Sequence, residues 1–177
     1  DNPLIVHISA LEQLEDLAED LSPAVYQMAE HFWPGPLTMV VKKKAVVPDR
    51  TSAGLDTVGI RMPSHPVARA IIDAAGVPLA APSANTSGKP SPTCAEHVIE
   101  DLDGRVDCII DGGECTFGVE STIVKILQDE QGQPYLLTMQ ADQSITTPAS
   151  AAYHNITDEM LPETEPETKA TPLFYHV

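Results

Sequence analysis

The sequence has 177 residues, of which 42% are hydrophobic and 20% are charged, so it can bury one sizeable core but not two independent ones. It contains no apolar run of the roughly 20 residues that a membrane-spanning helix needs, and its start lacks the basic and apolar regions of a signal peptide. A membrane partner is therefore not expected, and the protein is predicted to be cytoplasmic. Three cysteines without CxxC spacing are expected to be reduced thiols.

The net charge of −16 is concentrated at the two ends of the chain. Residues 1–30 and 126–177 each carry a net charge of −7, whereas residues 31–125 hold nine basic and eleven acidic side chains. Binding to nucleic-acid phosphates needs clustered Lys and Arg, so the overall charge argues against tight binding to nucleic acid. Any chemistry that binds anions is expected in the nearly neutral middle of the chain.

Hydrophobic periodicity predicts an alternation of strands and helices. In chain order the predicted elements are a strand at 4–8, helices at 11–21 and 23–32, strands at 37–41 and 57–61, a helix at 66–75, a strand at 78–81, a helix at 94–102, and strands at 107–111, 121–127 and 135–137. Ser22 and Thr93 are expected to cap the helices that follow them. The prolines on either side of Gly35 should end the predicted helix at 23–32 before the strand at 37–41 begins.

This alternation predicts an α/β fold in which a sheet is layered with helices. Beyond about residue 140 the apolar pattern fades, and residues 162–167 have the composition of a disordered linker. We therefore expect one domain over residues 1–140 and a flexible acidic tail over residues 141–177.

Arg61 is the first candidate binding residue. It closes a predicted strand, and Pro63 and Pro66 stiffen the turn that follows, which also contains His65. A guanidinium that is held in place suits a carboxylate or a phosphate. The alternative is an ordinary surface arginine beside a turn.

Two further segments place small polar side chains after or before strands. Ser83, Asn85 and Ser91 lie in a Pro- and Gly-rich loop at residues 82–92, where small side chains let a phosphate or ribose approach the backbone. The same residues are also ordinary turn formers. Ser121 is the first residue of the predicted strand at 121–127. The sequence lacks GxxxxGK[ST], GxGxxG and GxSxG, so a P-loop, a Rossmann cradle and a serine-hydrolase elbow are not indicated.

Taken together and in order, six segments resemble the YrdC family of threonylcarbamoyl-AMP synthases. They are residues 2–7 (NPLIVH), 33–38 (WPGPLT), 59–66 (GIRMPSHP), 81–88 (APSANTSG), 91–93 (SPT) and 120–122 (EST). The resemblance implies a YrdC-like fold, a twisted and mostly mixed sheet with flanking helices. It also implies a reaction that joins L-threonine, bicarbonate and ATP with Mg²⁺ to give threonylcarbamoyl-AMP and pyrophosphate.

Carried over by position, the resemblance assigns two sets of residues. His7, Arg61, Ala81 and Ser121 match positions that surround L-threonine. Asn2, Thr57, Ser83 and Ser91 match positions that contact ATP, and Asn85 is a further polar contact in the same loop. No nucleophile is assigned, because the protein mainly has to position its reactants and stabilise charge.

The sequence departs from the family pattern at its start, and two alternative functions are also considered. Family members normally have a Pro-Thr-Glu-Thr-Tyr-Gly type motif and a Lys-x-Arg segment before the Asn-Pro that starts this chain, so we expect the domain to be N-terminally incomplete and its activity impaired. The product would pass to a tRNA-modifying transferase complex. Two alternatives are the carbamoyl-adenylate module of hydrogenase maturation and a non-catalytic module with weak RNA binding.

Overall fold

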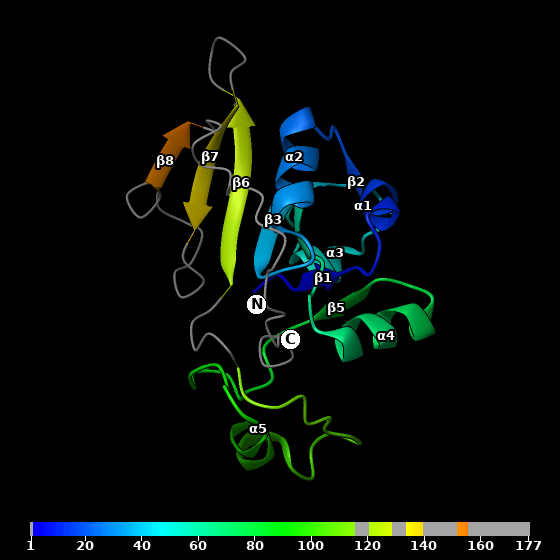
Figure 1. The fold of residues 1–177 in the computed structure, drawn as a ribbon, viewed down its shortest axis with the longest axis vertical. Coiled ribbons are helices and arrows are strands. Elements are labelled where there is room, and N and C mark those ends of the chain that lie inside the picture. The colour runs from blue at the N-terminus through cyan, green and yellow to red at the C-terminus, as the bar shows by residue number, and fades with distance from the viewer. Residues whose placement is uncertain (1, 116–120, 129–133, 140–151, 156–177) are drawn as a thin grey trace.

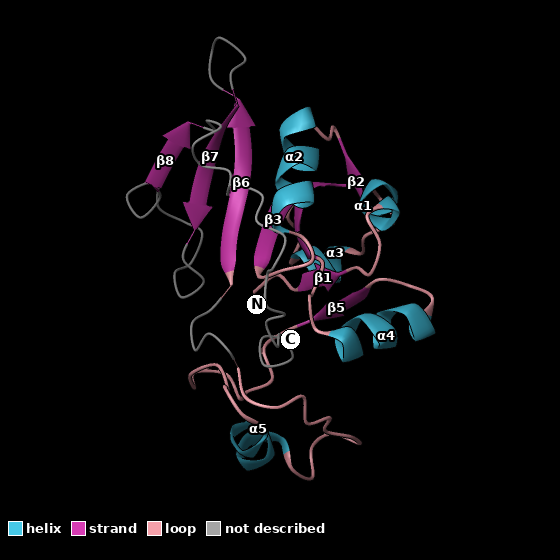
Figure 2. Ribbon diagram, in the orientation of Figure 1, coloured by secondary structure: helices cyan, strands magenta, loops and turns pink. Residues whose placement is uncertain are grey.

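The computed structural model describes residues 2–115, 121–128, 134–139 and 152–155. Figures 1 and 2 show a twisted sheet with helices beside it, and a lobe around helix α5 that stands apart from the sheet. In chain order the elements are β1 (Ile5–His7), α1 (Glu12–Leu17), β2 (Ala18–Glu19), α2 (Pro23–Phe32), β3 (Leu37–Lys43), α3 (Asp49–Ser52), β4 (Thr57–Arg61), α4 (Pro66–Ala75), β5 (Leu79–Ala81), α5 (Ala95–Leu102), β6 (Thr122–Gln128), β7 (Pro134–Met139) and β8 (Ala152–Asn155).

Neighbouring strands of the sheet follow the order β5-β1-β4-β3-β6-β7-β8, and β2 pairs with β3. β1 is parallel to β4 and β3 is parallel to β6, whereas β1 with β5, β3 with β4, and the β6-β7-β8 run are antiparallel. The sheet is therefore mixed, which confirms the predicted fold class.

One face of the sheet holds the hydrophobic core. Side chains alternate between the two faces of a strand, so every second residue of β1, β3 and β4 points to the same side. This face packs against α1 and α2, and the core between them includes Val6, Ile8, Leu14, Leu17, Val25, Met28, Met39, Val41, Val58, Ile60 and Val124. Gly35 lets the chain turn tightly between α2 and β3, because a Cβ there would lie 2.3 Å from the carbonyl oxygen of Phe32.

The predicted helix at residues 11–21 is shorter in the structure. It ends at Leu17 because Ala18 and Glu19 pair with Lys43 and Lys42 as strand β2. The apolar spacing continued to Leu21, but pairing with the edge of β3 competes with the last helical turn. Lys42, at the end of the long strand β3, binds Asp20 at 2.7 Å and Glu19 at 3.1 Å.

Two other predictions are wrong in detail. Residues 107–111 do not form a strand, and within the described ranges nothing pairs with them, while Ile110 is 47% exposed. Helix α5 begins one residue later than predicted, with Cys94 at the N-cap position, and the backbone N–H of Thr93 donates to His97. Ser22 does occupy the N-cap position of α2, although its side chain makes no capping hydrogen bond.

Most of the predicted tail, 141–177, lies outside the described residues. The part that is described, Ala152–Asn155, forms β8 against β7, a strand that the fading apolar pattern does not predict. The division at residue 140 stays a prediction. Among the described residues, no helix is both long enough and apolar enough to cross a membrane.

Candidate functional site

The candidate site lies on the sheet face opposite the core, which we call the site face. His7 is opposite Arg61 in the parallel β1-β4 pair, and β3 and β4 are antiparallel with Met39 opposite Ile60. Continuing that register by one residue sets Thr38 opposite Arg61. His7, Arg61 and Thr38 therefore form one line across three strands, which we call the polar row, with neighbours about 5 Å apart.

A second line of side chains crosses the site face next to the polar row. The pairs Ala81 with Ile5, Ile5 with Gly59, Gly59 with Val40 and Val40 with Lys125 run from β5 to β6. A Cβ at Gly59 would lie 3.2 Å from Cγ2 of Thr38, which is tighter than ordinary packing. Glycine thus keeps the floor of the site open beside the polar row.

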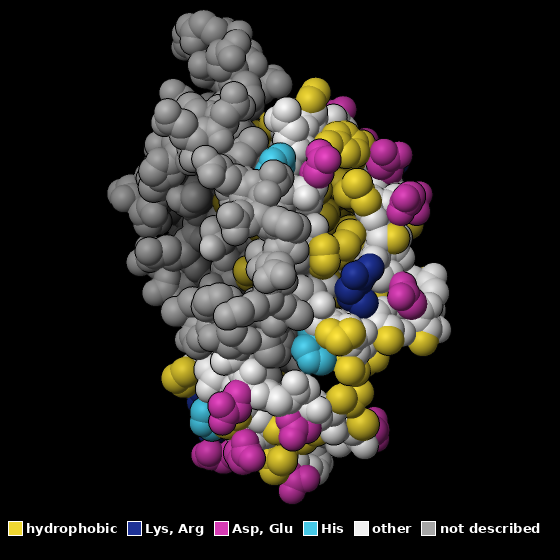
Figure 3. Space-filling model, viewed as in Figure 1, with side chains coloured by type: hydrophobic (Ala, Val, Ile, Leu, Met, Phe, Trp, Pro, Cys, Tyr) yellow, Lys and Arg dark blue, Asp and Glu magenta, His cyan; other side chains and the backbone are white. Residues whose placement is uncertain are grey.

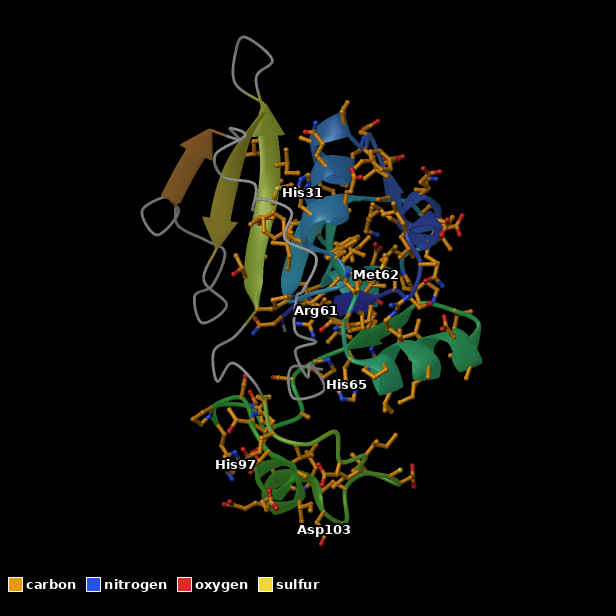
Figure 4. All side chains as sticks on the ribbon, viewed as in Figure 1. His31, Arg61, Met62, His65, His97 and Asp103 are labelled. Atoms are coloured by element: carbon orange, nitrogen blue, oxygen red, sulfur yellow. The ribbon has the colours of Figure 1, made fainter. Side chains whose placement is uncertain are left out.

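The polar row is buried, which is unusual for charged side chains. His7 is 4% exposed and Arg61, which Figure 4 labels, is 0% exposed. Burial lowers the pKa of Arg61 to about 10. A guanidinium at this position still carries its charge at neutral pH, but without the hydration that water would give it, so a bound anion would offset part of the cost of burial.

Burial also controls the protonation of His7. Its pKa is lowered from 6.5 to about 4, first by burial and then by the positive charge of Arg61, while backbone groups of Leu79 and Ile5 act in the opposite direction. His7 is therefore neutral at pH 7. Neither of its ring nitrogens makes a well-formed hydrogen bond with the described residues. A neutral imidazole has one donor and one acceptor, so it can bind either an amine or a carboxylate.

The remaining residues predicted to contact L-threonine lie around the polar row. Ala81 is the last residue of β5 and pairs with Ile5, so it lies in the second line of side chains, next to the polar row that contains His7. Ser121 directly precedes β6, whose first residue, Thr122, is opposite Leu37 at the start of β3. Because Leu37 is next to Thr38, Ser121 enters the sheet at the end that carries the polar row. The structure thus brings all four predicted residues to one part of the site face.

Three of the four residues predicted to contact ATP lie toward the other end of the same strands. Thr57 begins β4, and Asn2 precedes β1, which runs parallel to β4. Ser83 follows β5, which is antiparallel to β1, so the end of β5 lies beside the start of β1. Thr57 and Arg61 are separated by four residues of β4, or about 13 Å. Ser91 lies further along the loop at residues 82–92 and is half-buried.

Asp101 of α5 holds the loop at residues 82–92. Its carboxylate accepts hydrogen bonds from the backbone N–H of Thr86 at 3.0 Å and from the Thr86 hydroxyl at 3.1 Å, and it forms an ion pair with Lys89. The hydrogen bond from Lys89, followed by the one from the Thr86 backbone, holds the pKa of Asp101 below its ordinary value. The loop is therefore shaped by contacts to the α5 lobe.

Asn85 contributes to this loop in a second way. Its side-chain amide donates to the carbonyl oxygens of Thr86 at 3.1 Å and Lys89 at 2.9 Å. Its Oδ1 is buried and has no hydrogen-bond partner among the described residues. Asn85 thus stabilises the loop with its donors and keeps an acceptor for a ligand.

His65 lies outside the polar row. It occupies the N-cap position of α4, where its Nδ1 accepts a hydrogen bond from the backbone N–H of Val67 at 3.3 Å. Figure 4 shows it at the start of α4. The prolines around it fix this cap, and Arg61 is the charged group that the turn leaves on the site face.

The described residues do not form a binding cage for Mg²⁺. No group of three His, Cys, Asp or Glu side chains in the described parts of the chain could hold a metal ion. The two lines across the site face also contain no carboxylate, the ligand that Mg²⁺ prefers. We therefore derive no step through the metal, and Mg²⁺ stays a prediction as the counter-ion that accompanies ATP.

Comparisons with known proteins agree with this geometry. Residues 1–137 match the Sua5/YciO/YrdC family, which is described as "Telomere recombination". The chain belongs to this family. Relatives named threonylcarbamoyl-AMP synthase include proteins from Pyrococcus abyssi, 54% identical over 128 residues, and Bacillus subtilis, 54% identical over 131 residues. These alignments cover 72% and 73% of this chain and 38% of each relative, so the chain spans less than half of their length.

A solved structure extends the family comparison to a ligand. The structure of P. abyssi Sua5 complexed with L-threonine is 55% identical, with a TM-score of 0.69 over 70% of this chain and 36% of that one. Full-length HypF in its phosphate- and nucleotide-bound form is 17% identical with a TM-score of 0.63, a likeness that concerns the fold alone. The comparisons thus favour the synthase relatives over the hydrogenase-maturation alternative.

Sequence reasoning missed three residues that shape this site. Thr38, Gly59 and Asp101 were not singled out, although Thr38 and Gly59 each carry a signal in the sequence. Thr38 is a hydroxyl residue in the apolar run at residues 37–41, and Gly59 interrupts a strand of branched residues. Asp101 lies among exposed acids of α5, and only its contacts with Thr86 and Lys89 distinguish it.

Proposed function

We propose that this chain carries the L-threonylcarbamoyladenylate synthase reaction, in which L-threonine, bicarbonate and ATP give threonylcarbamoyl-AMP and pyrophosphate. The observation that supports it most is the buried Arg61 beside the neutral His7 on the site face. The chain is also 54% identical to the P. abyssi protein named threonylcarbamoyl-AMP synthase.

L-Threonine fits the chemistry of the polar row. The guanidinium of Arg61 pairs with the amino-acid carboxylate, and the Ser121 hydroxyl donates to it. Neutral His7 can accept a hydrogen bond from the amine, and the small side chain of Ala81 leaves room beside it. The buried guanidinium makes this pairing stronger than it would be at an exposed site, because less water competes for it.

ATP fits the other end of the same face. Asn2, Thr57, Ser83 and Ser91 supply small polar groups there, and Asn85 offers Oδ1 as an acceptor for an N–H group of the nucleotide. With the nucleotide at one end of the strands and the amino acid at the other, the α-phosphate lies between them. This arrangement brings the two reactants together without a covalent intermediate.

The reaction itself needs two bonds to form. The amine of L-threonine bonds to the carbon of bicarbonate, and water leaves, which gives an N-carboxylated amino acid. A carbamate oxygen then attacks the α-phosphorus, the bond to the bridging oxygen breaks, and pyrophosphate leaves with the electron pair. The protein holds the amino acid by its carboxylate and leaves the lone pair of its amine available to react, so orientation is its main contribution.

We place this reaction in the cytoplasm, with the product passing to a tRNA-modifying transferase complex. The three free cysteines of the chain fit a reducing compartment. On the face shown in Figure 3, acidic side chains are spread over the described surface and basic ones are sparse. That distribution favours delivery of a small product over tight RNA binding.

The test is the release of pyrophosphate from ATP by the purified chain with Mg²⁺, L-threonine and bicarbonate. We expect release to require both L-threonine and bicarbonate, and to fall at least tenfold in Arg61→Ala. The relative from P. abyssi serves as the positive control. An inactive chain that also binds neither L-threonine nor ATP in calorimetry, beside an active control, would contradict the proposal.

A further inference from the structure

The Thr38 hydroxyl is buried and has no partner within the described part of the chain. Thr38 is 0% exposed, and its Oγ1 makes no hydrogen bond there. A buried hydroxyl normally finds a partner, because an unpaired one loses its hydration without replacement. This one lies in β3 on the site face, not in the core, so its partner can come from a ligand.

The position of Thr38 relative to Arg61 indicates which chemical group of a ligand its hydroxyl can bind. The two residues are opposite each other across the β3-β4 pair, where facing Cβ atoms are about 5 Å apart. A group bound by the Arg61 guanidinium is therefore within reach of a hydroxyl from the next strand. A carboxylate has several acceptor positions and can accept from both side chains at once.

The orientation of Thr38 supports a fixed role for the hydroxyl. Its Cγ2 methyl faces the space above Gly59, where a Cβ would approach it to 3.2 Å. The methyl group therefore points toward Gly59 and the second line of side chains. Threonine is stiff at χ1 in a strand, so the same packing also fixes the hydroxyl.

We infer that Thr38 is a further binding residue for the amino-acid substrate, whose hydroxyl donates a hydrogen bond to the carboxylate that Arg61 pairs with. This inference rests on the proposed function and adds a third strand to the threonine site. It explains why a hydroxyl residue occupies a fully buried position in an otherwise apolar stretch of β3. A valine has the same shape and would bury its methyl group at lower cost if the hydroxyl had no role.

The experiment measures L-threonine affinity by calorimetry in wild type, Thr38→Val and Thr38→Ser. Thr38→Val should weaken binding about tenfold or more, because hydrogen bonds to charged groups are the stronger ones. Thr38→Ser keeps the hydroxyl and should stay within about threefold of wild type. The melting temperature of Thr38→Val should equal or exceed that of wild type, which separates a lost contact from a lost fold.

A second ligand tests the carboxylate contact on the wild-type chain itself, so this result does not depend on how well a variant folds. L-Threoninol has a hydroxymethyl group in place of the carboxylate, so wild type and Thr38→Ser should both bind it far more weakly than L-threonine. Equal L-threonine affinity in wild type and Thr38→Val would overturn the inference and leave the proposed function intact. A wild-type chain that binds no L-threonine, beside a P. abyssi control that does, would instead remove the proposed function and the inference with it.

Discussion

The polar row and the loop at residues 82–92 both offer polar groups to a ligand, but they are built differently. His7, Arg61 and Thr38 are buried and stand on three neighbouring strands of one sheet. The loop is mostly exposed, and its shape depends on Asp101 in the α5 lobe. Under the proposed function, the sheet fixes the residues that bind the amino acid, whereas the loop that binds the nucleotide depends on contacts that one substitution can remove.

The largest effect is expected at Arg61. Replacing it with alanine removes a buried charge-assisted contact, so the affinity for L-threonine should fall by about 2 kcal/mol or more, or roughly 30-fold. Affinity for ATP should change much less, since Thr57 and Arg61 lie at opposite ends of β4. Calorimetry with each ligand measures both effects. Arg105→Ala, an exposed arginine just after α5, is the matched control, and an equal loss of L-threonine affinity in the two variants would remove Arg61 from the site.

The next effect concerns pH and His7. Its pKa is about 4 in the folded protein and 6.5 when unfolded, so the unfolded chain binds more protons between these values. The free energy of unfolding should therefore fall as the pH drops through this window, by at most about 3 kcal/mol from this residue. Urea unfolding at pH 7 and pH 4.5 should show a smaller loss in His7→Gln than in wild type. An identical loss in both proteins would mean that His7 is not buried as a neutral ring.

A smaller effect is expected at Gly59, in the second line of the site face. The new Cβ of Gly59→Ala lies 3.2 Å from Cγ2 of Thr38 and 3.7 Å from Cγ1 of Ile5. Thr38 must shift by a few tenths of an ångström, so L-threonine affinity should fall about three- to tenfold. Gly113→Ala, at an exposed glycine whose φ of +92° strains any side chain, is the control and should lower stability while leaving L-threonine affinity unchanged. Unchanged L-threonine affinity in Gly59→Ala would show that the ligand does not contact the surface around Gly59.

The smallest effect is expected at Asp101, and it should appear on the other ligand. Asp101→Asn breaks the ion pair with Lys89 and weakens the bonds to Thr86, so ATP affinity should fall a few-fold while L-threonine affinity stays the same. Asp103→Asn, an exposed acid at the end of α5, is the control. Because the pKa of Asp101 is lowered, its contacts persist at neutral pH and are lost only as the pH falls through that lowered value. Equal ATP affinities in wild type and Asp101→Asn would mean that the loop keeps its shape without this carboxylate.

The sequence predicted much of the sheet because β1, β3, β4 and β6 carry strong apolar or branched runs. It failed where tertiary pairing decides the outcome. Ala18 and Glu19 leave a helical pattern to pair with β3, and residues 107–111 have a strand-like composition but no partner in the described part of the chain.

The candidate site was predicted in part for the same reason. The segments that resemble the family include Arg61 and His7, and the register of β1 with β4 then sets them side by side. Thr38 can be recognised as a site residue only when β3 is aligned against β4, because Arg61, its neighbour in the polar row, is 23 residues away in the sequence. Residues 116–120 and much of the chain beyond residue 139 lie outside the described part, so the flexible acidic tail stays a prediction.

The most direct test of the central claim compares L-threonine with L-threoninol on the wild-type chain. If Arg61 and the rest of the polar row hold the carboxylate, L-threonine should bind at least 30-fold more tightly than L-threoninol, and Arg61→Ala should abolish most of that difference. Calorimetric titrations of both ligands into both proteins give the four affinities needed. Equal binding of the two ligands to the wild-type chain would contradict the account, because the carboxylate of L-threonine would then contribute nothing to binding.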